Sequence, residues 1–153
     1  MTKKKIAYIG AGIVALVLGY FNYFGSDKET GEIRKLVETI NAVYENDDLR
    51  IEAEKEIDYI DEKESKFEKA KAMIQGMILS GDNVFLDKDK NLTLDTNILG
   101  ISPNGWEIKA SELKYNKETQ ELVSVKPMYA KNAEKGVEVL ANKFKTTISM
   151  DNI

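Results

Sequence analysis

Alternation of apolar and polar residues dominates the chain after residue 48. Residues 49–54 alternate strictly, as in a strand with one buried face. Turn-forming residues recur every 8 to 12 positions, most clearly in the Ser-Pro-Asn-Gly sequence of residues 102–105. The pattern also predicts one buried strand over residues 73–79, a turn at 81–83 and a strand over 122–129. Short strands with regular turns indicate an all-β domain.

Residues 31–44 are ambiguous, because their apolar positions also fit helical spacing. The same segment is rich in residues that favour strands, including Val37, Thr39 and Ile40. We predict a strand over residues 39–44 that turns at 45–48 into the strand beginning at Leu49. Periodicity by itself favours a helix.

A short motif repeats along the chain. The sequence of residues 49–53 (LRIEA) recurs at 106–110 (WEIKA), with a shorter echo at 137–141 (VEVLA). A tyrosine follows the first two copies, Tyr59 and Tyr115, and a charged turn follows each tyrosine. The alternation changes phase near Ala110, which predicts a β-bulge there.

The N-terminus predicts a membrane anchor. Residues 6–24 carry no formal charge, follow Lys3, Lys4 and Lys5, and approach the length needed to cross a bilayer. The lysines place the N-terminus in the cytoplasm by the positive-inside rule. A cleaved signal peptide is the alternative, but it is usually shorter and ends in a small-x-small site. The expected organisation is therefore a tag and transmembrane helix at 1–25, a linker at 26–32 and an exterior domain at 33–153.

One face of the expected helix carries small residues every four positions. Such a ladder allows another membrane helix to approach closely, although alanine and glycine are common in these helices anyway. Both interpretations stay open. The candidate docking residues are Ala7, Ala11, Ala15 and Gly19.

Composition excludes several classes of function. Beyond the lysine tag lie 26 acidic and 19 basic residues (22 minus Lys3, Lys4 and Lys5), a net charge of −7 that argues against nucleic acid as a partner. The chain has no histidine and no cysteine, so the commonest general base and thiol nucleophile are missing. We expect no enzymatic activity, no cofactor and no metal site. Glu52, Glu54, Glu56 and Asp58 are interpreted as one solvated strand face.

The repeated motif resembles a known family. Residues 105–122 (GWEIKASELKYNKETQEL) resemble the repeated hairpin of LptC and LptA/OstA-like proteins, and residues 136–144 resemble the start of the next hairpin. An N-terminal anchor followed by one β domain is similar to LptC rather than to soluble LptA. The resemblance implies a twisted open β-jellyroll of short antiparallel hairpins, preceded by a single transmembrane helix.

The resemblance also implies a function. An LptC-like protein sits in the bacterial inner membrane with its domain in the periplasm. It receives lipopolysaccharide from the permease of an ABC transporter and passes it to an LptA-like bridge protein. The apolar interior would hold acyl chains, and a sheet edge would pair with the bridge. The alternative is a membrane-tethered structural or adaptor β domain with a filled core, which binds an exterior protein by sheet-edge pairing.

Candidate site residues follow from these two hypotheses. Inward apolar positions serve equally as a lipid groove or as an ordinary core, and the sequence leaves both open. The groove candidates are Ile51, Ala53, Tyr59, Phe67, Ile108, Ala110, Tyr115 and Val125, and the partner-edge candidates are Phe144, Thr146 and Ile148.

Overall fold

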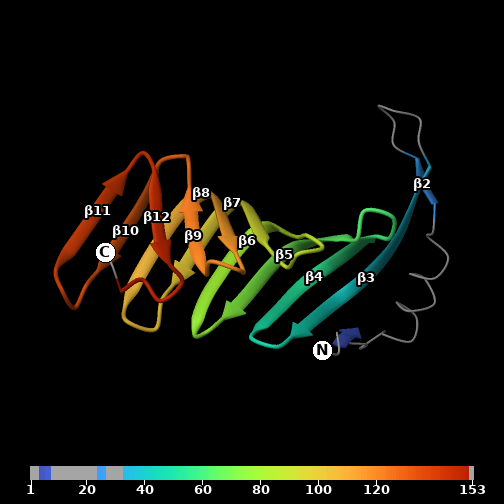
Figure 1. The fold of residues 1–153 in the computed structure, drawn as a ribbon, viewed down its shortest axis with the longest axis horizontal. Coiled ribbons are helices and arrows are strands. Elements are labelled where there is room, and N and C mark those ends of the chain that lie inside the picture. Colours follow the sequence, from blue (N-terminus) through green and yellow to red (C-terminus); the bar gives the residue numbers. More distant parts are fainter. Residues whose placement is uncertain (1–3, 8–23, 27–32, 152–153) are drawn as a thin grey trace.

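The computed structural model describes residues 4–7, 24–26 and 33–151 (Figure 1). Within these residues the chain is all-β and contains no helix, which confirms the all-β part of the predicted fold class. The strands are β1 (Lys4–Ala7), β2 (Phe24–Ser26), β3 (Ile33–Asn46), β4 (Leu49–Tyr59), β5 (Glu64–Ile74), β6 (Met77–Leu86), β7 (Leu92–Ile101), β8 (Trp106–Asn116), β9 (Glu121–Ser124), β10 (Met128–Asn132), β11 (Val137–Ala141) and β12 (Phe144–Thr147).

The strands form one open antiparallel sheet. From β3 to β8 each strand pairs with the next one in sequence, and the sheet branches at β8. The first half of β8 pairs with β10, which pairs with β11, whereas its last residues pair with β9, which pairs with β12. β11 and β12 therefore end two separate branches (Figure 1).

β3 resolves the ambiguous segment as a strand. It pairs with β4 from Leu36 opposite Tyr59 to Asn46 opposite Leu49, and the chain turns at residues 47–48 between them. The prediction of a strand over residues 39–44 is confirmed, and the helical periodicity was misleading. Cross-strand pairing with β4 satisfies the backbone of this segment along most of its length.

Most strands are longer than the pattern predicted. Residues 73–79 are two strands, because Gln75 and Gly76 form a tight turn with φ values of 49° and 84°. Positive φ at both central residues is the mark of a hairpin turn that matches strand twist. The predicted turn at 81–83 lies instead inside β6, and the predicted strand 122–129 is broken around Pro127 between β9 and β10.

The buried face of most long strands changes sides near the middle. In β5 the buried positions are Ser65 and Phe67 before the change, and Ala70, Ala72 and Ile74 after it. The same change of phase occurs in β4, β6 and β8. In β7 the buried positions keep one phase, and two consecutive exposed residues, Thr96 and Asn97, lie at the change. We call the row where it happens the crease, and it consists of Asn41, Glu54, Lys69, Asp82, Thr96, Asn97 and Ser111.

Backbone irregularities produce the crease. Lys69 adopts a φ of 48°, and Thr96 and Asn97 adopt 67° and 53°. The register shifts between β6 and β7 and again between β7 and β8, both times at the Thr96–Asn97 step. The bulge expected near Ala110 is therefore present, with the extra residue on the neighbouring strand β7. A bulge bends a strand and redirects the side chains that follow it.

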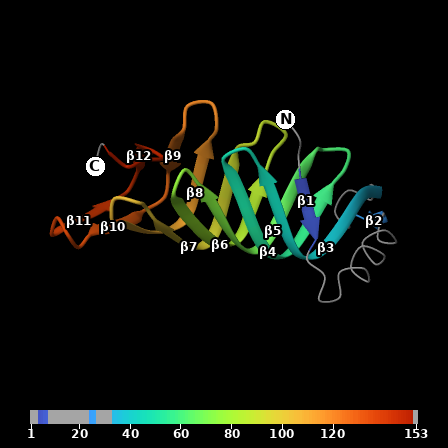
Figure 2. The same cartoon turned by 90° about the horizontal axis from the view of Figure 1, so that it is seen from below.

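The sheet bends at the crease into two layers that face each other. The first layer consists of the strand halves that contain Leu49, Ile74 and Trp106, together with β10 and β11. The second layer consists of the other halves of the same long strands, together with β9 and β12. Tyr44 of the first layer and Phe67 of the second meet edge to face, with ring centroids 6.1 Å apart. Figure 2 shows the hairpin turns of both layers gathered along one side of the molecule. We call this side the seam.

Small residues line the interior directly beside the crease. Ala53 pairs with Ala42 on one side and with Ala70 on the other, and Ala70 pairs with Gly81. Further along the sheet, Met128 pairs with both Ala110 and Ala141. The alanine that ends each copy of the repeated motif thus lies in one row. The layers converge there, so a larger side chain would push them apart.

The expected membrane anchor lies mainly in residues 8–23, outside the described residues. Its two ends fall in the short strands β1 and β2, which both pair with β3. Among the described residues, no helix is long and apolar enough to span a bilayer.

Replacing Ala70 with leucine tests the packing at the crease. Ala70 is 3% exposed, so the larger side chain should lower the free energy of unfolding by about 1–3 kcal/mol. Urea unfolding followed by the fluorescence of Trp106, the single tryptophan, measures the change. Lys71→Leu, at the exposed neighbouring position, should change stability by no more than about 0.5 kcal/mol. A neutral Ala70→Leu would show that this row does not set the layer spacing.

Candidate functional site

The interior between the two layers is the candidate site. Ile51, Phe67 and Ile108, predicted as groove residues, are fully buried, and Tyr115 is 4% exposed. They belong to one continuous apolar cluster, against which Ala53 and Ala110 pack. The structure therefore brings six of the eight predicted groove residues together.

Two predicted groove residues lie elsewhere. Val125 is in the loop between β9 and β10 and is 58% exposed, so its assignment to the interior was wrong. Tyr59 is half-buried at the end of β4 and outside the apolar cluster. The change of phase at the crease explains why Tyr59 is not inward. Tyr59 lies six positions after Ala53, whereas Tyr115 lies five positions after Ala110. The inward position equivalent to Tyr115 is occupied in β4 by Asp58.

The interior is polar at its β4 end. Glu56 is only 2% exposed and lies opposite Phe67, and the Ser65 hydroxyl donates a hydrogen bond to the Asp58 carboxylate. The prediction that Glu52, Glu54, Glu56 and Asp58 share a solvated face was therefore wrong for Glu56 and Asp58, because the crease separates them from the first two. At the matching inward positions of β8 stand Leu113 and Tyr115.

The apolar lining reaches solvent at the other end of the sheet. Inward-facing Val137 of β11 is 41% exposed, and Val139, Ala141 and Phe144 are only partly buried against the core. These residues lie where the two branches end, so the apolar inner face becomes partly exposed at β11 and β12.

The predicted partner edge is β12. Within the described residues it pairs only with β9, so its other side is an unpaired edge. Thr146 and Ile148 are 5% and 3% exposed, so they contribute to the core rather than to a side-chain contact surface. Ile148 follows the strand, and its N–H donates to the Gln120 carbonyl at 2.8 Å. What β12 can offer a partner is its backbone, with Phe144 at its start.

Side-chain contacts bring the layers together at the seam. The Lys117 ammonium of the second layer lies 3.9 Å from the Asp47 carboxylate of the first. The Lys90 ammonium lies 6.0 Å from the centroid of the Tyr44 ring. Nearer the C-terminus, the Asn104 amide donates to the carbonyl of Ser149 at 3.1 Å. No backbone pairing joins the two layers along this side in the described part of the chain.

Tyr115 reports on the closeness of the layers at the seam. Burial raises the pKa of its phenol, and the negative charge of Asp48 in the opposite layer raises it further. Both effects disfavour the phenolate.

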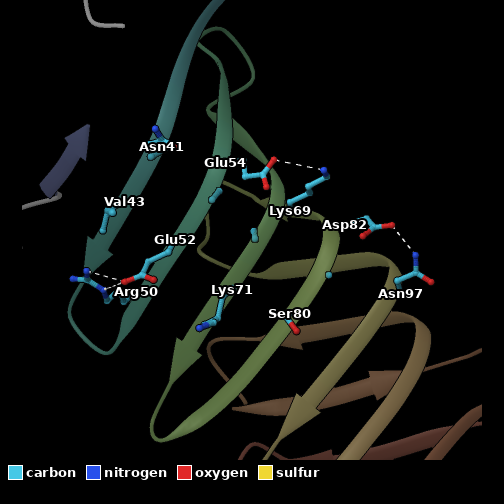
Figure 3. A pocket seen from close by; sticks show the side chains of 14 residues that line it. Asn41, Val43, Arg50, Glu52, Glu54, Lys69, Lys71, Ser80, Asp82 and Asn97 are labelled. Atoms are coloured by element: carbon cyan, nitrogen blue, oxygen red, sulfur yellow. Dashed lines mark hydrogen bonds and ion pairs between the residues drawn. The ribbon is translucent and has the colours of Figure 1, made fainter. Parts of the chain in front are cut away.

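A shallow groove of about 720 Å³ crosses the outer side of the crease (Figure 3). Glu54 and Lys69 form an ion pair of 3.6 Å there, and the Asn97 amide donates to Asp82 at 2.8 Å. The labelled side chains in Figure 3 are mostly charged or polar, and Arg50 pairs with Glu52 as Lys69 does with Glu54. These charged and polar side chains suit an acyl chain less well than the apolar interior, which stays the candidate site.

Comparison with known proteins gives no assignment, because the sequence matches no protein-family profile and no curated protein significantly. In the described ranges, acidic residues form no cluster suited to a metal ion. Of the proposed helix-docking residues, Ala7 lies in β1, whereas Ala11, Ala15 and Gly19 lie outside the described residues.

The sequence did not reveal the seam residues. Asp47, Lys90 and Lys117 lie in turns, where charged residues are ordinary, and their contacts join segments far apart in the chain. The alanine that ends each repeat could have indicated the crease. That a small residue is needed at this position follows only from how closely the two layers approach there.

Asp48→Asn tests the seam geometry. Loss of the charge should lower the pKa of Tyr115, measured as phenolate absorbance of the variant minus that of the same chain carrying Tyr115→Phe. Because the native pKa lies above the unfolded value of about 10, unfolding releases a proton above that pH and stability falls as pH rises. Tyr115→Phe should remove the contribution of Tyr115 to this decrease in the free energy of unfolding. Glu54→Gln, at the crease, should leave the Tyr115 titration unchanged; an equal shift in both variants would contradict the seam contact.

Proposed function

We propose that this chain is an LptC-like component of lipopolysaccharide export, anchored in the bacterial inner membrane with its domain in the periplasm. In this proposal the folded sheet is a twisted open β-jellyroll, and the chain keeps the single N-terminal membrane anchor expected from the sequence, which lies mainly outside the described residues. It receives lipopolysaccharide from the permease of an ABC transporter and passes it to an LptA-like bridge. It acts by binding and transfer, without chemistry.

One observation carries this proposal: the apolar interior is continuous from the core to an open end. Ile51 and Ile108 lie deep between the layers, and the same inward face continues to Val139 and Val137, where it meets solvent. An ordinary filled core is closed at both ends by polar residues or loops. A continuous apolar inner face with a partly exposed end suits an acyl chain that is handed from one protein to another.

The ends of the sheet suit transfer to a partner. β11 and β12 each have one unpaired side within the described residues, so a partner strand can extend either branch. A partner sheet joined there would place its own inner face in line with Val137 and Phe144. The acyl chain could then pass without crossing water.

Photocrosslinking tests lipid binding. A benzoyl-phenylalanine in place of Ile108 should form adducts with lipopolysaccharide in cells that make it, because that position faces the interior. The same group in place of Val125 should form at least about tenfold fewer, since Val125 faces solvent from a loop. Mass spectrometry of the purified chain identifies the adducts. Equal lipid labelling at both positions, or no labelling at Ile108, would contradict the proposal.

A second candidate, an adaptor domain that binds an exterior protein by its sheet edge, is favoured by β11. Leu140 on this strand is 81% exposed, and β11 pairs only with β10 within the described residues. An exposed apolar residue on an unpaired edge is a common feature of strand-addition sites. On this hypothesis the interior is a filled core and no lipid enters it.

A crosslinker at Glu138 distinguishes the adaptor from the lipid carrier. An adaptor should give a protein adduct at Glu138 and no lipid adduct at Ile108. Leu140→Asp should reduce the protein adduct at least about fivefold, whereas Val125→Asp, a matched exposed apolar position outside the strands, should not. A protein adduct that survives Leu140→Asp would argue against docking on β11.

A further inference from the structure

We infer that the seam is a gate: the two layers separate there to admit an acyl chain, and the contacts Asp47–Lys117 and Tyr44–Lys90 are its latch. This inference rests on the proposed function and adds where the lipid enters and what controls entry. The open end between β11 and β12 is then the exit.

The interior is closed along most of its length. Ile51, Leu94 and Leu113 are fully buried, so an acyl chain cannot reach them while the layers stay in contact. Along the crease the layers are joined covalently through every long strand. Along the seam the described residues show only contacts between side chains and a hydrogen bond from the Asn104 side chain to the carbonyl of Ser149 near the C-terminus. Separation at the seam leaves strand pairing within each layer intact.

The latch is weak by its chemistry. The side chains of Lys117 and Asp47 are 35% and 34% exposed, and ion pairs in contact with water contribute about 0–1 kcal/mol. The Lys90 ammonium lies at 6.0 Å from the centroid of the buried Tyr44 ring, the outer limit of a cation–π contact, and such contacts contribute about 0.5–2 kcal/mol. The latch itself therefore adds little to the cost of opening, and no ladder of backbone hydrogen bonds has to break. Most of the cost is exposure of the apolar faces of the two layers, which an entering acyl chain would cover again.

The crease has the features of a hinge. Asn41, Lys69 and Asn97 hold positive φ values in the middle of paired strands, where the ladder is already interrupted. A few residues that absorb a backbone change are sufficient for a hinge motion. Ala53 and Ala70 beside them present little side chain to obstruct a change in the angle between the layers.

Reversible bridging of the seam tests the gate in the full chain, reconstituted in lipid nanodiscs. The chain contains no cysteine, so Asp47→Cys with Lys117→Cys provides one defined thiol pair across the seam. A short bis-maleimide linker with a cleavable disulfide joins them. The readout is the lipopolysaccharide adduct of a benzoyl-phenylalanine at Ile108, or at Ala110 if the Ile108 variant folds poorly.

We expect the bridged protein to form at least about fivefold less adduct than the same sample after the linker is cleaved. Lys71→Cys with Ser80→Cys is the matched control, because these residues pair on adjacent strands of one layer. Bridging that pair should leave the adduct unchanged.

A variant without linker gives an independent measurement. Lys117→Ala removes the ion pair across the seam and should speed adduct formation by up to about fivefold, the factor that corresponds to an exposed pair. Lys145→Ala removes a pair of 3.0 Å with Glu121 inside the second layer and should leave the rate unchanged.

The outcomes separate the gate from the proposed function. Equal adduct in bridged and cleaved protein, with no effect of Lys117→Ala, overturns the gate and leaves lipid binding intact. Absence of adduct in every form, including the unbridged chain with native seam residues, overturns lipid binding and the gate together. A loss that persists after cleavage of the linker also contradicts the gate, because it reports damage from the substitutions.

Discussion

The change of phase at the crease is the constraint on which the rest of the structure depends. A strand of ten or more residues with unbroken alternation presents one apolar face to one side, and a single sheet of such strands leaves that face open to water. Here the inward position shifts by one residue in β5 at Lys69, which has a positive φ, and a bulge at Thr96–Asn97 shifts the register of β7 against its two neighbours. Both halves of each strand then face the same interior, and the sheet covers itself without a helix in the described residues.

Other features follow from this bend. The layers converge at the crease, so the inward positions beside it from β3 to β6 are alanine or glycine (Ala42, Ala53, Ala70 and Gly81), and larger residues such as Phe67 and Ile108 lie further away. The layers diverge beyond β8, so the sheet branches, and the inner face becomes accessible at Val137. Outward residues at the crease are polar and pair with one another, as Glu54 does with Lys69. Such exposed pairs contribute little stability, and apolar burial between the layers supplies most of it.

The two ends of the interior differ in polarity and exposure. It runs from buried Glu56 near β4, past the aliphatic residues of β7 and β8, to the half-exposed valines of β11. A domain that only held its own fold together would gain nothing from an apolar face left open at one end. Under the proposed function, this exposed end is the point of transfer, and the seam is a separate side for entry.

Sequence analysis predicted the local features and missed those that depend on the bend. Alternation identified the all-β class, and the turns at 102–105 and 116–119 were found because their residues favour turns by themselves. The turn at Gln75–Gly76 was missed because apolar residues flank it on both sides. Val125 and Tyr59 were placed inward because alternation was extended across positions where the phase breaks, and the same error placed Glu56 outside.

The sequence by itself determined that this chain forms strands, that the repeated motif ends in alanine, and that no histidine or cysteine chemistry is available. These properties belong to single residues and their near neighbours. Tertiary structure decided which face of each strand half is buried, that the alanines form one row, and that Lys117 meets Asp47. A bulge shifts every later side chain to the other face, and its position is settled by pairing with neighbouring strands that lie far apart in the chain.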